Sequence, residues 1–107
     1  MTLNQLRKIA LALPETSEEP HFHKISFRCR GKIFATVEAG HDVLNVMLGD
    51  AAREPLLAIH ADSLESLFWG NKVMGVRLQM AAADPALVRE LLQLAWREKA
   101  PKSLRPD

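Results

Sequence analysis

Near the amino terminus, hydrophobic residues recur every three or four positions, which is the spacing of an amphipathic helix. The apolar positions are Leu3, Leu6, Ile9, Ala10 and Leu13. Thr2 can cap the first turn, and Pro14 ends the pattern. The following residues, 15–24, are polar and include Pro20, so we expect a loop there.

The period then changes to strict alternation, which is typical of strands with one buried face. Apolar and polar residues alternate over residues 25–30, 33–37 and 44–48, with corners at Gly31 and Gly40. Three consecutive strands with short connections predict an antiparallel meander.

A short helix and a second hairpin are predicted next. Asp50 can cap a helix that carries Leu56, Leu57 and Ile59, and Pro55 is best tolerated if it lies in the first turn. Two strands then meet at the Gly70-Asn71 turn. The first of these contains Leu67 and Trp69, and the second alternates from Met74 to Met80.

The last helix has the broadest apolar stripe. Asp84 and Pro85 are an N-cap followed by a first-turn proline, and the pattern ends near Pro101. The complete order, α-β-β-β-α-β-β-α, predicts an α+β fold in which an antiparallel sheet of about five strands carries the N- and C-terminal helices on one face. We expect one domain over residues 1–107, with residues 100–107 as a short C-terminal tail.

Composition narrows the class of protein only a little. The 107 residues are 48% hydrophobic and 25% charged, and the formal net charge is +1, so no bulk positive charge indicates a nucleic-acid partner. The lone cysteine, Cys29, favours a reducing compartment, and no apolar run approaches the ~20 residues that span a bilayer. We therefore expect a soluble, cytoplasmic protein without a membrane partner, and a monomer.

Positive charge is nevertheless gathered locally. Lys24, Arg28, Arg30 and Lys32 occur without an acid between them, and Arg97, Lys99, Lys102 and Arg105 crowd the C-terminal end. If Phe27 points inward, Arg28 and Arg30 share the outer strand face and could grip successive phosphates. The alternative is an ordinary solvated strand face, in which arginine discourages edge pairing. The residues alone favour this second interpretation.

Candidates for chemistry are few. His21 and His23 have the spacing of a two-imidazole clip, but no recognised ligand spacing completes a zinc site, and Cys29 fits a buried core position better than a nucleophile. Motifs for phosphate cradles and redox dithiols are absent from the sequence. We expect no catalytic residues, metal site or cofactor.

The two tryptophans, Trp69 and Trp96, allow two interpretations. They could pack in the core, or line a groove between sheet and helix that binds an apolar ligand. The sequence has no tyrosine and suggests no exposed aromatic ladder, which counts against base stacking on the sheet.

Four ordered blocks of the chain resemble the YjbR/MmcQ family of small bacterial proteins. The blocks are "ALALPETSEEP", "SFRCRGKIFATV", "LFWGNKVMGVRLQM" and "LLQLAWREKAPKSL", which together span most of the chain. One departure is Met74, where family members often carry tryptophan.

The resemblance implies a frataxin-like (CyaY-like) sandwich and a DNA-binding role of the double-wing type, without established catalytic residues. On this chain the matching cations are Lys24, Arg28, Arg30 and Lys32 on the first hairpin, Lys72 and Arg77 on the second, and Lys99 and Lys102 after the last helix. The expected function is thus non-enzymatic contact with the backbone of double-stranded DNA, with weak sequence specificity. The alternative is a small-molecule or protein-partner binding module with a groove near Trp69 and Trp96.

Overall fold

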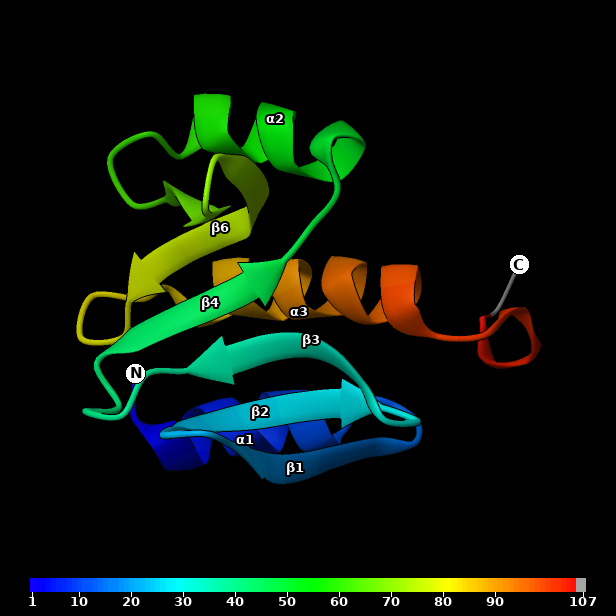
Figure 1. Ribbon diagram of the computed structural model, residues 1–107. Coiled ribbons are helices and arrows are strands. Elements are labelled where there is room, and N and C mark those ends of the chain that lie inside the picture. Colours follow the sequence, from blue (N-terminus) through cyan, green and yellow to red (C-terminus); the bar gives the residue numbers. More distant parts are fainter. Residues whose placement is uncertain (106–107) are drawn as a thin grey trace.

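A computed structural model describes residues 1–105 and contains one antiparallel sheet with helices packed mainly on one face (Figure 1). In chain order the elements are α1 (Leu3–Leu11), β1 (Thr16–His21), β2 (Lys24–Cys29), β3 (Lys32–Val37), β4 (Val43–Met47), α2 (Asp50–Ile59), β5 (Glu65–Trp69), β6 (Lys72–Gln79), α3 (Pro85–Lys99) and the 3₁₀ turn η1 (Lys102–Leu104). The α+β class and the order of the predicted elements are confirmed.

The sheet has six strands in the order β1-β2-β3-β4-β6-β5, one more than expected. The additional strand is β1, in the stretch predicted as a loop. It pairs with β2 along its whole length, from Thr16 opposite Cys29 to His21 opposite Lys24. Because β1 is an edge strand, it tolerates Pro20, and its partly exposed side chains give no alternating apolar pattern.

The N-cap residues of α1 and α3 were predicted correctly, but the N-cap of α2 was not. Thr2 forms a capping box with Gln5, and Asp84 accepts a hydrogen bond from the Ala86 backbone N–H. The N-cap of α2 is Gly49 rather than Asp50, which is the first helical residue. Pro55 lies inside α2, beyond the first turn, where a proline is best tolerated.

The core lies between the sheet and the pair α1 and α3. Figure 1 shows both helices behind the sheet, while α2 lies beyond β6. Phe27 and Phe34 from the sheet are fully buried in one cluster with Leu91 and Leu92 of α3. The opposite face, which we call the open face, has no helix over it in the described chain.

The expected tail is at least partly packed. Ala100 is buried, and Leu104 of η1 packs against the core. Residues 106–107 of that prediction lie outside the described residues. None of the helices within residues 1–105 is long and apolar enough to cross a membrane.

Candidate nucleic-acid interface

The antiparallel order of the sheet collects several chain reversals at one end of the molecule. β2 ends and β3 begins there, as do β5 and β6, and α3 also ends there because it runs back after β6. Four lysines lie at these ends: Lys32 and Lys72 begin β3 and β6, Lys99 ends α3, and Lys102 begins η1. We call this set of four lysines the basic end.

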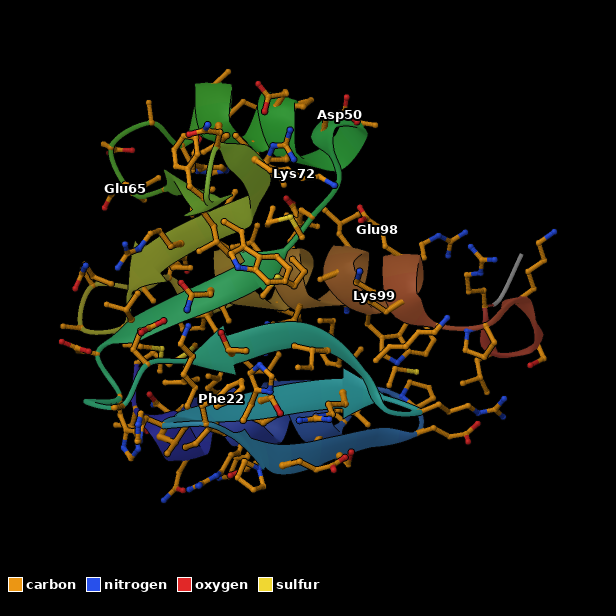
Figure 2. The ribbon with its side chains drawn as sticks, in the orientation of Figure 1. Phe22, Asp50, Glu65, Lys72, Glu98 and Lys99 are labelled. Atoms are coloured by element: carbon orange, nitrogen blue, oxygen red, sulfur yellow. The ribbon has the colours of Figure 1, made fainter. Side chains whose placement is uncertain are left out.

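The lysines of the basic end keep their charge free for a partner. Lys32, Lys72 and Lys102 are exposed and Lys99 is partly exposed, and within residues 1–105 none of the four forms an ion pair. Lys72 and Lys99 line one cavity of about 400 Å³ together with Arg53, Asp50 and Glu98. Figure 2 shows Lys72, Glu98 and Lys99 around this corner. The Glu98 carboxylate already accepts a hydrogen bond of 2.9 Å from the Gly49 N–H.

Arg28 lies on the open face and is held by neutral groups. Its Nε donates to Ser26 Oγ at 2.9 Å, and its Nη2 donates to the Pro20 carbonyl at 3.2 Å. Neutral acceptors orient the guanidinium without cancelling its charge. Arg28 therefore presents a cation on the open face, but its guanidinium is directed toward the end of β1 and away from the basic end.

Arg30 does not share that face, contrary to the prediction from alternation. It lies in the turn after β2, with φ 48°, and is followed by Gly31 at φ 83°. Left-handed backbone turns its side chain back to Glu15, where two hydrogen bonds of 2.8 and 2.7 Å form a bidentate ion pair. The hydrogen bond from Arg30 lowers the pKa of Glu15. The pair of guanidinium groups expected on one strand face is thus not formed.

Lys24 and Arg77 belong to the opposite end of the sheet. Lys24 Nζ lies 3.2 Å from Glu38 Oε2, and Asn45 Nδ2 also donates to that carboxylate. Burial raises the pKa of Glu38, but hydrogen bonds from Asn45 and Lys24 outweigh burial, and the charges of Lys24 and Arg77 add to them, so the pKa is lowered. Arg77 Nε is buried without a hydrogen-bond partner in the described chain. Both cations interact with the Glu38 carboxylate and lie away from the basic end.

A groove of about 510 Å³ crosses the open face from the β1–β2 turn to the β5–β6 turn. Three of its aromatic side chains are largely exposed: Phe22 at 90%, Phe68 at 61% and Trp69 at 78%. Thr36, Asn45, Met47, Met74 and Lys99 also line it. Figure 2 shows Phe22 over β2, with Lys99 toward the opposite corner of this face.

Trp96 does not take part in this groove, so the prediction that both tryptophans flank one groove is wrong. The Trp96 side chain is 6% exposed on the helical side, and its Nε1 donates to the Pro14 carbonyl at 2.9 Å. Cys29 is fully buried, and burial raises the pKa of its thiol. Neither side chain is accessible for binding.

Sequence reasoning missed the exposed aromatics. The sequence suggested no exposed aromatic ladder, whereas Phe68 and Trp69 of β5 and Phe22 of the β1–β2 turn are all exposed. Phe22 is the one aromatic residue in a polar stretch of the sequence, and this was a usable signal for an exposed turn residue. The structure places it in a turn with φ 58°. Phe68 follows an irregularity in the β5–β6 pairing, which alternation along one strand does not reveal.

His21 and His23 find no further metal ligands nearby. Within residues 1–105, no three His, Cys, Asp or Glu side chains gather closely enough to hold a metal ion. The His21 ring instead contacts the Phe22 ring edge-on, with centroids 4.9 Å apart.

Comparison with known proteins assigns the family. The model of the YjbR family matches residues 11–98, which is most of the chain. The chain belongs to the YjbR family. A crystal structure of a Deinococcus radiodurans protein with a DUF419 domain has the same fold, with a TM-score of 0.76 at 20% sequence identity over 98% of this chain and 83% of that one. No curated protein matches this YjbR chain.

Proposed function

We propose that this YjbR protein is a non-enzymatic DNA-binding protein that contacts the phosphate backbone of a duplex with its basic end. The observation that carries the proposal is the gathering of Lys32, Lys72, Lys99 and Lys102 at one end without ion pairs in the described chain. Flexible ammonium groups suit phosphate contacts, which fix the position of a protein on DNA without reading its sequence.

The small net charge is compatible with this role because the cations are unevenly placed. Glu38 forms an ion pair with Lys24 at the other end of the sheet, and Glu15 forms one with Arg30. We therefore assign the phosphate contacts to the basic end and leave out Lys24 and Arg77. Arg28 is also left out, because its guanidinium is directed toward Pro20, near the opposite end of the sheet. Weak sequence preference follows, because lysine contacts to phosphates do not read the bases.

Salt dependence of duplex binding tests the proposal. We expect the affinity for a random 20-base-pair duplex, measured by fluorescence anisotropy, to fall steeply as salt rises, because each phosphate contact releases counterions. Lys32→Ala/Lys102→Ala should reduce the slope of log K against log salt by about two, or roughly one for each lysine.

The matched control removes two positive charges elsewhere. Lys8→Ala/Arg89→Ala changes exposed cations on α1 and on the first half of α3. This control should bind duplex within about twofold of wild type, because its cations make no phosphate contact. Equal weakening by both double variants would refute the proposed surface, and binding that ignores salt would refute the proposed function.

A further inference from the structure

We infer that the groove on the open face binds an unpaired segment of DNA, with bases stacked on Trp69 and Phe68 and phosphates against Lys99 and Lys72. The inference rests on the proposed function and extends it from the duplex backbone to exposed bases. It assigns the binding of bases to the open face, with two lysines of the basic end contacting the phosphates of the same strand.

The first support is the kind of surface that is left uncovered. Five large hydrophobic side chains are exposed within residues 1–105, and three of them, Phe22, Phe68 and Trp69, line this one groove. Exposed apolar side chains that gather in one place mark interaction surfaces, whereas scattered ones are ordinary. The helical layer lies on the other side of the sheet (Figure 1), so these rings are accessible from solvent.

The second support is the charge around these rings. The groove is lined by Lys99, which forms no ion pair, by Lys24, which is paired with Glu38, and by no carboxylate among the described residues. Aromatic faces combined with lysines suit single strands, whose bases stack while their phosphates are neutralised. A purely apolar peptide would gain nothing from Lys99 at the edge of its site. The charge therefore favours a polyanion with flat apolar groups.

The third support is a polar floor beneath the aromatic side chains. Thr36 and Asn45 are 4% and 2% exposed, yet both line the groove. Asn45 uses its amide nitrogen to donate to Thr36 Oγ1 at 3.1 Å and to Glu38. This arrangement leaves its carbonyl oxygen as an acceptor for a base amino group.

The groove is continuous with the basic end, and this favours DNA as its ligand. Lys99 lines both the groove and the cavity that contains Lys72, and Met47 and Met74 are shared in the same way. A strand that leaves a duplex at the basic end can therefore enter the groove directly. The site fits the boundary between double-stranded and single-stranded DNA.

Tryptophan fluorescence of the full chain tests this inference. Titration with dT12 should quench the emission of the exposed Trp69, because a stacked base contacts its indole, while Trp96 is buried behind the sheet. Anisotropy with labelled dT12 should show a loss of affinity of about tenfold or more for Phe68→Ala and for Trp69→Ala.

Ile59→Ala is the matched control, because Ile59 is 72% exposed on α2, outside the groove. It should bind dT12 like wild type, and far-ultraviolet circular dichroism should show all three variants folded. Unchanged fluorescence, or equal dT12 affinity for wild type and Trp69→Ala, would overturn the inference and leave the groove to a protein or small molecule. Tighter binding of rU12 than of dT12 would overturn the assignment to DNA.

The two proposals fail separately. If duplex binding ignores salt while Trp69→Ala still weakens dT12 binding, the proposed function is wrong for duplex DNA and the groove assignment stands. If duplex binding depends on Lys32 and Lys102 while dT12 leaves the fluorescence unchanged, only the groove assignment is wrong.

Discussion

Single residues decide how closely the central strands can approach. Gly75 on β6 lies opposite Met47 of β4, and a Cβ at this position would be 1.9 Å from the Val46 carbonyl oxygen. No real contact of a Cβ with backbone is that short, and the backbone cannot swing aside as a flexible side chain can. The two strands therefore require glycine here because of space alone.

We predict that Gly75→Ala lowers the free energy of unfolding by at least ~2 kcal/mol, because it overpacks a backbone contact in the middle of the sheet. Urea denaturation followed by tryptophan fluorescence measures the change. Gly49→Ala is the control, since its Cβ would meet only the flexible Glu98 carboxylate at 3.4 Å. Comparable stability of the two variants would contradict the prediction.

At the scale of elements, β1 shows what holds a strand that periodicity does not define. Its ladder with β2 supplies the backbone bonds, and a bidentate ion pair ties it to α1, with Arg7 Nε and Nη2 donating to Glu18 at 2.7 and 2.8 Å. The hydrogen bonds from Arg7 lower the pKa of Glu18 from its ordinary 4.5. A lowered carboxyl pKa stabilises the fold above the unfolded value and ceases to do so as acid protonates the folded state.

We therefore expect Glu18→Gln to reduce stability at pH 7 by less than ~1 kcal/mol, because the pair is partly solvated. The difference from wild type should begin to shrink as the pH falls below about 4.5, where the unfolded chain takes up a proton at Glu18, and should disappear only at the lower pH where the folded carboxyl is protonated too. Urea midpoints at pH 7 and pH 3 provide the measurement. Glu90→Gln, at an exposed position on α3, should differ little from wild type at either pH, and a Glu18→Gln deficit that is no smaller at pH 3 than at pH 7 would exclude the ion pair as its cause.

The sequence could predict an element only where the residues that determine it lie within that element. Helices α1 and α3 carry their own caps, Thr2 and Asp84, and were therefore predictable. Strand β1 depends on its partner, so a polar stretch with Pro20 looked like a loop. The groove was only half predicted, because alternation identified Trp69 but did not reveal that Trp96 lies on the other side of the sheet.

At the scale of the whole molecule, the fold separates two binding surfaces that meet at Lys99. The basic end follows from the common end of β2, β5 and α3, and the groove follows from a sheet that is covered on one face. A ligand that reaches both surfaces pays the entropic cost of association only once.

We predict that a 20-base-pair duplex with a twelve-thymidine overhang binds at least ~10-fold more tightly than either the duplex or dT12 alone. Competition anisotropy at one salt concentration measures the three affinities. Lys32→Ala/Lys102→Ala and Trp69→Ala should each reduce the affinity for the overhang duplex toward that of the segment they leave intact. Equal affinities for all three DNAs would show that the two surfaces do not act together.

The pairing of β4 with β6 has a consequence for how the chain assembles. It is the one neighbouring pair in the described sheet that is not consecutive in the chain, and Val46 meets Val76 across it. Residues before α2 and residues after it each form local hairpins quickly, whereas their joining must wait for a distant encounter. We therefore expect closure of this seam to be slower than formation of the hairpins. A chain divided after α2 would give two fragments that join along the β4–β6 pairing and through the packing of α3 on β3 and α1.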